Sequence, residues 1–134
     1  MQAVERIDEK GGYVAIDFRG CSSQELSEVY QAFALLCVRE KVRWALLKTG
    51  DEDAEAHFAL RDILVTVARI AGVPVRFRLA LVAGSDAIVQ VGQTMQKELS
   101  PLGCDARIFR AEGRANDWLR ARKPQQQLPV AEAA

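Results

Sequence analysis

From Tyr13 onward, short apolar runs alternate with longer segments in which apolar residues recur at helical spacing. Short runs rich in β-branched and aromatic residues are typical of strands, and the longer spacing is typical of helices that bury one face. Regular alternation of the two predicts an α/β domain whose strands are mostly parallel and are joined by right-handed helical crossovers. No other feature of the chain restricts its fold as strongly.

The expected order of elements is β-β-α-β-α-β-α-β-α, a mixed, mostly parallel five-stranded sheet packed by about four helices. The expected strands span residues 4–7, 13–18, 42–47, 77–82 and 106–109. The expected helices span residues 22–39, 51–71, 85–99 and 114–122. The first two strands form a hairpin, with residues 8–12 as its turn. One domain over residues 1–122 is therefore expected, followed by a flexible C-terminal tail at 123–134.

The first of these helices has a clear start and a clear buried face. Ser22 and Glu25 have the spacing of a capping box, in which each side chain bonds the backbone amide of the other residue. At ~100° per residue, one stripe of this helix is formed by Leu26, Val29, Tyr30, Phe33 and Cys37. We expect that stripe to pack on the sheet.

The charges of the chain balance, because 18 Lys and Arg stand against 18 Asp and Glu in 134 residues. General attraction to nucleic acid or to an anionic membrane needs a surplus of positive charge, so the balance argues against both. A local basic patch near the ends of the fourth and fifth predicted strands would consist of Arg76, Arg78, Arg107 and Arg110. No aromatic residues are interleaved with these arginines, so we expect solvated strand ends and no nucleic-acid partner.

The N-terminal residues are charged and lack the apolar run of a signal peptide, and no stretch reaches the roughly 20 apolar residues that span a bilayer. We therefore expect a cytoplasmic protein without membrane insertion. Cys21, Cys37 and Cys104 are widely spaced, and one histidine is too few to complete a zinc site, so three free thiols are expected. Cys21 precedes a helix N-terminus, a position that can lower the pKa of a thiol.

The order of elements and two segments in the second half of the chain resemble a known family. The fourth predicted strand contains Leu79-Ala80-Leu81-Val82, and the chain closes on Ile108-Phe109 followed by Ala115-Asn116-Asp117-Trp118-Leu119. Together with the order of elements, these segments resemble the STAS domain of the bacterial anti-sigma factor antagonists, and especially the STAS-like proteins of bacterial genomes that lack a settled function. The resemblance covers residues 4–121. It implies a regulatory, non-enzymatic domain that docks a protein partner.

In anti-sigma factor antagonists, a phosphorylated Ser or Thr lies in an Asp-Ser-Gly-like motif between the third strand and the second helix. The matching segment here, residues 48–55, contains no such motif, and Thr49 is its only hydroxyl. Thr49 is therefore the phosphorylation candidate, although the acidic residues beside it would repel a phosphate. Two interpretations of these acids stay open: they stabilise the helix N-terminus, or they form a permanently negative surface where the family has a switchable one.

The second predicted helix provides a candidate contact face. Phe58 and Val65 point ~160° away from the apolar stripe of this helix, among charged residues. In the resembling family this helix meets the partner protein. The candidate partner-binding residues are Asp51, Glu52, Asp53, Phe58, Arg61, Asp62 and Val65. The alternative is that isolated exposed apolar residues have no function.

No set of residues for catalysis is visible in the sequence. His57 has no positioned Ser or Cys beside it, and Asp51 and Asp53 lack further ligands for Mg²⁺. The segment 84–86 follows a strand but lacks the glycine pattern of a phosphate-binding loop. We therefore expect no enzyme, no catalytic residue, no metal and no cofactor, and we interpret His57 as a surface or cap residue.

The leading hypothesis is a protein-interaction domain that docks a protein partner, or a second copy in a homodimer, through its acidic loop and second helix. The alternative is a carrier of a small apolar or lipid-like ligand. A carrier needs an internal cavity above roughly 300 Å³, and a filled core would favour docking. The bulky residues that could fill such a cavity are Phe18, Phe33, Trp44 and Phe77.

Overall fold

A computed structural model describes residues 6–10, 12–71 and 76–121. Its strands are Ile7–Lys10 (β1), Tyr13–Asp17 (β2), Trp44–Lys48 (β3), Phe77–Val82 (β4) and Cys104–Phe109 (β5). Its helices are Ser23–Arg39 (α1), Ala59–Ala71 (α2), Asp86–Leu99 (α3) and Glu112–Ala121 (α4). Two short 3₁₀ helices are Ala54–Phe58 (η2) and Ser100–Leu102 (η3). None of these helices is long and apolar enough to cross a lipid bilayer.

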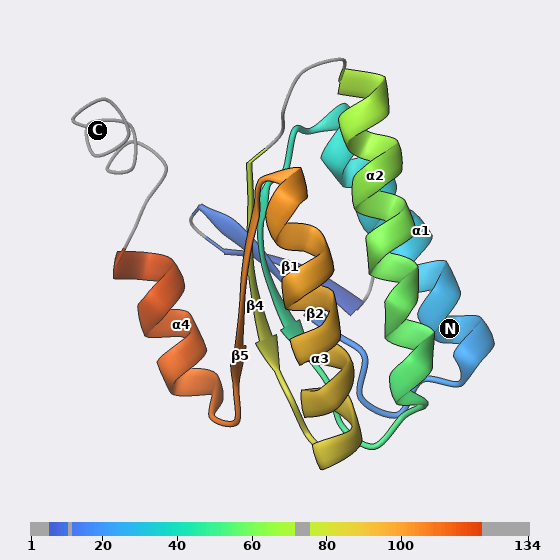
Figure 1. Cartoon of the computed structure of the whole chain (residues 1–134), viewed down its shortest axis with the longest axis vertical. Helices are drawn as coiled ribbons and strands as arrows, with labels where there is room; N and C mark the ends of the chain where they lie inside the picture. The colour runs from blue at the N-terminus through green and yellow to red at the C-terminus, as the bar shows by residue number, and fades with distance from the viewer. Residues whose placement is uncertain (1–5, 11, 72–75, 122–134) are drawn as a thin grey trace.

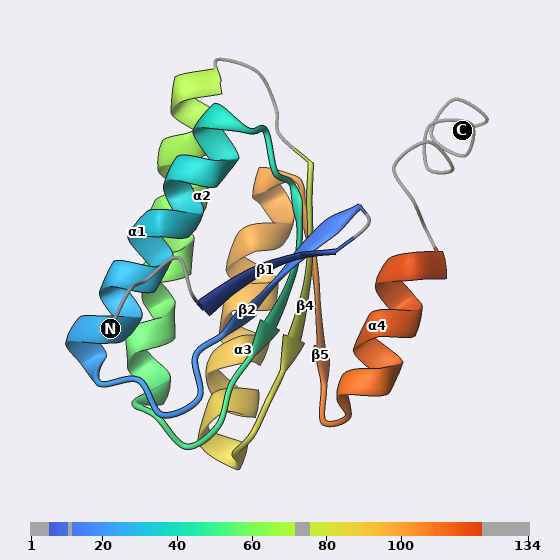
Figure 2. The same cartoon turned by 180° about the vertical axis from the view of Figure 1, so that it is seen from behind.

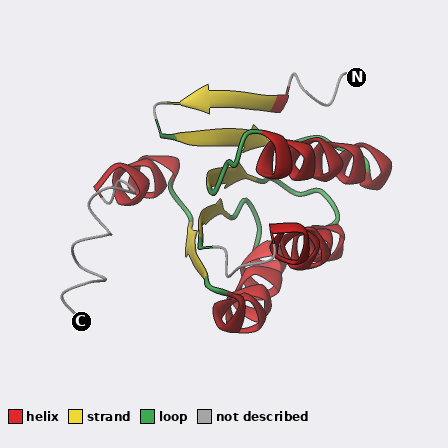
Figure 3. Cartoon of the chain, turned by 90° about the horizontal axis from the view of Figure 1, so that it is seen from above, coloured by secondary structure: helices red, strands yellow, loops and turns green. Residues whose placement is uncertain are grey.

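The strands form one mixed sheet in the order β1-β2-β3-β4-β5. β1 pairs antiparallel with β2, and each later neighbouring pair is parallel. Figures 1 and 2 show α1, α2 and α3 on one face of the sheet and α4 on the other, and Figure 3 shows the same layers from above. Because each of the three crossover helices returns to the same face, the strands follow one another in chain order. The predicted α/β class, mixed sheet and order of elements are confirmed.

The hairpin is present, but its first strand lies later than the sequence pattern predicts. Asp8, Glu9 and Lys10, assigned above to the turn, belong to β1 and pair with β2. β1 is an edge strand whose charged side chains reach solvent, so it needs few apolar residues to pair. Residues 4, 5 and 11 of the predicted strand and turn lie outside the described residues, as does the predicted tail from residue 123 onward.

Apolar side chains pack on both faces of the sheet. On one face, the predicted stripe of α1 is buried and joins alternate strand residues such as Ile16 and Leu79 in the main core. The predicted capping box begins α1. On the other face, Ala115 and Leu119 of α4 form a smaller cluster with Trp44. Successive residues of the inner strands therefore face different helices.

Arg78 is a buried charge rather than part of a basic surface. Alternation along β4 turns its side chain to the α4 face, where the residue is 1% exposed. Its guanidinium lies 5.2 Å from the ring centroid of Trp44 and 3.5 Å from that of Trp118. Nη1 donates a hydrogen bond to Asp105 at 3.0 Å. The expectation of a solvated strand end is therefore wrong for Arg78, whereas the other three arginines of the possible basic patch are exposed.

Candidate functional site

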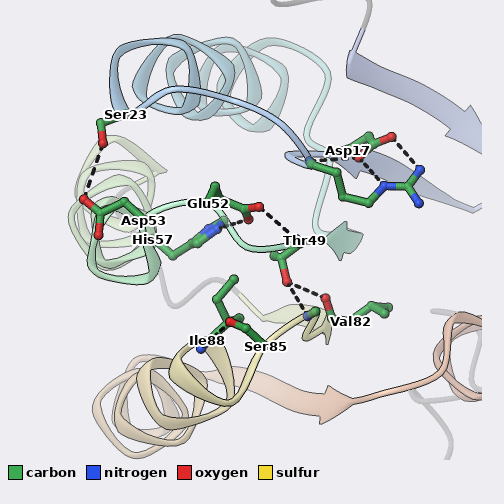
Figure 4. Close-up of polar contacts among 12 residues, drawn as sticks. Asp17, Ser23, Thr49, Glu52, Asp53, His57, Val82, Ser85 and Ile88 are labelled. Atoms are coloured by element: carbon green, nitrogen blue, oxygen red, sulfur yellow. Dashed lines mark hydrogen bonds and ion pairs between the residues drawn. The ribbon is translucent and has the colours of Figure 1, made fainter.

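The loops that follow β2, β3 and β4 meet at one end of the sheet, close to the N-termini of α1, η2 and α3 (Figure 4). Parallel strands joined by helical crossovers place their carboxyl-end loops together. The acidic loop, defined here as Asp51, Glu52 and Asp53, follows β3 and therefore lies in the middle of this row. The segment that the sequence singles out is thus held on both sides by other loops.

Thr49 joins the end of β3 to the end of β4. Its hydroxyl donates a hydrogen bond to the Val82 carbonyl at 2.7 Å and accepts one from the Gly84 backbone amide at 3.0 Å. The residue is buried. A phosphate could be attached to this hydroxyl only after both hydrogen bonds are broken and the loop has opened. The geometry therefore argues against Thr49 as a phosphorylation site.

Gly84 brings the backbones of these two loops into direct contact. A Cβ atom at this position would lie 2.5 Å from the Gly50 Cα and 2.6 Å from the Thr49 carbonyl oxygen. Both distances are too short for non-bonded atoms, so a glycine is required for the loops to approach this closely. Gly84, which lies in a segment without the glycine pattern of a phosphate-binding loop, therefore has a role in loop packing.

Glu52 points into the protein and not toward solvent. Its Oε2 lies 2.8 Å from His57 Nε2, and its Oε1 accepts a hydrogen bond from the Gly50 amide at 2.8 Å. The Tyr30 hydroxyl of α1 lies 2.7 Å from His57 Nδ1. We call Tyr30, His57 and Glu52 the buried triad. Two predictions are corrected here: the Glu52 side chain is not part of an exposed contact face, and His57 is a core residue.

Both ring nitrogens of His57 are bonded within the buried triad. Nε2 is hydrogen-bonded to the Glu52 carboxylate, and Nδ1 is hydrogen-bonded to the Tyr30 hydroxyl. Burial by itself would raise the pKa of Glu52, but hydrogen bonds from His57 and from backbone amides outweigh it and hold the pKa below its usual value. Burial raises the pKa of Tyr30 well above its usual value. The triad therefore contains a carboxylate and a protonated phenol, which the His57 ring connects.

The buried triad has a positioning role. Its three side chains are enclosed, and the Phe18 ring packs against Tyr30 and His57 at centroid distances of 4.6 and 4.9 Å. A substrate cannot reach the triad without unfolding of the loop. Its three hydrogen-bonded groups come from α1, the acidic loop and η2, so they fix the acidic loop against the core.

Asp51 and Asp53 remain exposed on either side of the anchored Glu52. Asp53 caps η2 by accepting a hydrogen bond from the Glu55 amide at 3.2 Å, and it also accepts one from the Ser23 hydroxyl at 3.4 Å. Asp51 makes no hydrogen bond or ion pair with the described residues. Two interpretations of these acids were left open above. Asp53 fits the first, because it stabilises a helix N-terminus, and Asp51 fits the second, because it is a negative group at the surface.

The predicted contact face of the second helix is only partly exposed. A 3₁₀ helix has about 3.0 residues per turn and an α-helix about 3.6, so the change from η2 to α2 shifts the phase at Phe58. Phe58 is half-buried and packs on the main core, which corrects the prediction that it points away. Arg61 lies over the Phe58 ring at 5.4 Å and donates to Glu98 of α3 at 2.6 Å. Val65 is also half-buried, whereas Asp62 is exposed.

Other candidate sites contain little room or reactivity. A pocket between α3 and the sheet, lined by residues such as Leu81, Met95 and Ile108, has a volume of about 20 Å³, far below what a lipid-like ligand fills. In the described ranges, no three or more His, Cys, Asp or Glu side chains are grouped to hold a metal ion. The three cysteines are buried free thiols. Burial raises the pKa of Cys21, so its position before α1 does not activate it.

The sequence pattern does not reveal the role of Tyr30 and His57. Tyr30 was assigned correctly to the buried stripe of α1, but a buried tyrosine hydroxyl needs a polar partner, and that requirement is the one signal that could have revealed the triad. The single histidine of the chain meets this requirement from 27 positions away.

Comparison with known proteins identifies no relative, because no family model, curated protein or solved structure matches the chain. The STAS-like assignment therefore remains a prediction based on the order of elements and the segments quoted above.

Proposed function

We propose that the protein is a non-enzymatic, STAS-like docking domain that binds a protein partner, or a second copy of itself, through the acidic loop and the adjoining surface of α2. One observation carries the proposal: Glu52 is anchored in the core while its neighbours Asp51 and Asp53 are exposed. A loop held in this way presents two carboxylates in a fixed arrangement. Little conformational entropy is then lost when a partner binds.

The charge of this surface defines the chemistry of the partner. Besides Asp51 and Asp53, Glu55 of η2 and Asp62 of α2 are exposed acids, and Arg61 is paired with Glu98. A partner with Lys or Arg side chains around a small apolar centre complements it, with the half-buried Phe58 as the apolar contact. Exposed charges of this kind act mainly on the association rate and on specificity.

Site-specific photo-cross-linking tests the proposal. A benzophenone side chain at Glu55 should cross-link one saturable partner in the native host, or a second copy of the chain, and the same group at the exposed Lys97 of α3 should not. With that partner purified, Asp51→Lys should weaken binding roughly tenfold or more, and added salt should weaken it further.

Glu9→Lys is the matched control, because it makes the same charge change at an exposed residue of β1. Equal affinity of the wild type and Asp51→Lys would exclude the acidic loop as the binding surface. Equal cross-linking from positions 55 and 97 would also contradict the proposal.

A further inference from the structure

β5 is the last strand of the sheet, and its outer edge has no paired strand in the described part of the chain (Figure 3). The Phe109 carbonyl accepts a hydrogen bond from the Ala83 amide at 2.8 Å, so the backbone groups of Phe109 point toward β4. The backbone N–H and C=O groups of successive residues point to opposite sides of a strand. Those of every second residue of β5 therefore point away from β4, toward the free edge. The outward-facing residues are Cys104, Ala106 and Ile108.

The two edges of the sheet differ in how they discourage pairing. β1 has four residues, and three consecutive ones are charged, Asp8, Glu9 and Lys10. Short edge strands that carry several charges are protected against pairing with another chain. β5 has six residues and two charged side chains of opposite sign, Asp105 and Arg107, both about half exposed. Of the two edges, β5 is the one that another strand could extend.

The sequence of β5 is self-complementary when a second copy pairs antiparallel with it about Ala106. In that register Asp105 of each copy lies directly opposite Arg107 of the other copy. On the α3 side of the sheet, Cys104 lies opposite Ile108, and the Ala106 residues face each other. Both charge pairs are attractive and the remaining pairs are apolar. Such cross-strand pairs stabilise a sheet relative to Ala–Ala pairs.

The neighbouring two-fold registers are disfavoured by the same two charges. Pairing about Asp105 places the two Asp105 carboxylates opposite each other, and pairing about Arg107 places the two guanidinium groups opposite each other. Like charges directly across from one another destabilise a sheet. The charges of β5 therefore select the register about Ala106 among these three.

We propose that the protein forms a two-fold symmetric dimer in which the β5 strands of two copies pair antiparallel about Ala106. Three hydrogen-bonded pairs, those at residues 104, 106 and 108, would supply about six backbone hydrogen bonds. This association goes beyond the docking function proposed above, because it uses the free edge of β5 and not the acidic loop or the surface of α2. The acidic loops of the two copies would lie at opposite ends of a continuous sheet.

Gln96 of α3 regulates access to this edge. Its Nε2 donates a hydrogen bond to the outward Ala106 carbonyl at 2.8 Å. Val89 and Gln93, which are uncharged, share the face of α3 that carries Gln96. A carbonyl oxygen has two lone pairs and can accept from both Gln96 and a second strand. The Gln96 side chain nevertheless occupies space at the edge where the second strand would pair, so we expect its removal to strengthen the dimer.

Sedimentation equilibrium of the full chain measures the dimer directly. Wild type should show a monomer–dimer equilibrium, and Arg107→Glu should raise its dissociation constant roughly tenfold or more, since both charge pairs become repulsive. Arg114→Glu is the matched control, because it makes the same charge change at an exposed residue of α4 and should leave the dimer unchanged. Gln96→Ala should lower the dissociation constant. A protein that stays monomeric at millimolar concentration would overturn the proposal.

Hydrogen exchange of the wild type identifies the surface without a substitution. The Ala106 amide should become protected as the protein concentration rises, by at least about tenfold between the monomeric and dimeric ranges, and the inward Arg107 amide should show no such dependence. A dimer in which the Ala106 amide exchanges as fast as in the monomer would show that another surface is used. A dimer of Arg107→Glu as stable as that of wild type would also refute the β5 register, provided circular dichroism shows the variant folded.

Discussion

His57 Nε2 lies 2.8 Å from Glu52 Oε2, and both side chains are completely buried. The other ring nitrogen of His57 meets the Tyr30 hydroxyl of α1, so one imidazole connects the loop after β3 to α1. Buried polar groups stabilise a single conformation when all of them are satisfied, and each is costly when one partner is lost. The position of the acidic loop therefore depends on residues that do not themselves reach the surface.

Loss of the imidazole should be strongly destabilising. His57→Ala leaves the Glu52 carboxylate and the Tyr30 hydroxyl without their partner and opens a cavity, so we expect a loss of about 3 kcal/mol in the free energy of unfolding. Tyr30→Phe leaves His57 Nδ1 without its hydrogen-bond partner and should cost about 1–2 kcal/mol. Urea denaturation measures both. Asp51→Ala, next to the triad but exposed, should stay within about 0.5 kcal/mol of wild type. Equal stability of His57→Ala and wild type would contradict the positioning role.

The buried carboxylate should make the fold sensitive to acid. The pKa of Glu52 lies below its usual value of 4.5 in the folded protein, so its stabilisation is fully present above 4.5 and is lost as the pH falls through the folded value. Glu52→Gln cannot titrate, and its free energy of unfolding should fall less steeply than that of wild type between about pH 6 and pH 3. Parallel curves for the two proteins would show that Glu52 is not coupled to folding. Hydrogen bonds from Arg19 lower the pKa of Asp17. Asp17 should therefore contribute to the pH dependence of the free energy of unfolding in both proteins.

Two glycines should respond in opposite directions to the same substitution. Gly84→Ala places a methyl group within 2.6 Å of the Thr49 carbonyl oxygen, and overpacking of this kind costs about 1–3 kcal/mol. Gly113 lies in α4, and a Cβ there meets no atom within 4 Å. Gly113→Ala should therefore stabilise the protein by about 0.5–1 kcal/mol, because alanine loses less backbone entropy in a helix. Thermal unfolding compares the two. A Gly84→Ala protein as stable as wild type would mean that the two loops are not in contact in solution.

The volume of the Arg78 side chain should contribute more to the free energy of unfolding than its charge does. Arg78→Met retains most of the side chain between the Trp44 and Trp118 rings, and Asp105 remains about half exposed to water. We expect Arg78→Met to cost about 1 kcal/mol and Arg78→Ala about 3 kcal/mol, because only the second leaves a cavity between the rings. Unfolding followed by tryptophan fluorescence reports on both rings. If Met and Ala cost the same, the charge and not the packing of Arg78 holds α4 in place.

Several local features could be predicted from the chain alone. The capping box and buried stripe of α1 match in every residue, and β4 spans the predicted residues. Both depend on neighbours within a few positions, where spacing and side-chain type decide the conformation. The start of β1 and the phase at Phe58 were wrong, because edge pairing and a 3₁₀ turn depend on contacts outside the segment.

By itself, the sequence determined the α/β class, the order of elements and the apolar faces, because periodicity and end signals are local properties of the chain. The tertiary structure alone decided which polar residues are surface groups. Glu52 and Arg78 belong to charged segments, yet one is turned inward by Tyr30 and His57 and the other by the alternation of β4 beneath α4. A buried charge needs partners. Arg78 finds Asp105 on β5, and the His57 partner of Glu52 is itself held by Tyr30 of α1, so these sets of groups meet only when the chain has folded.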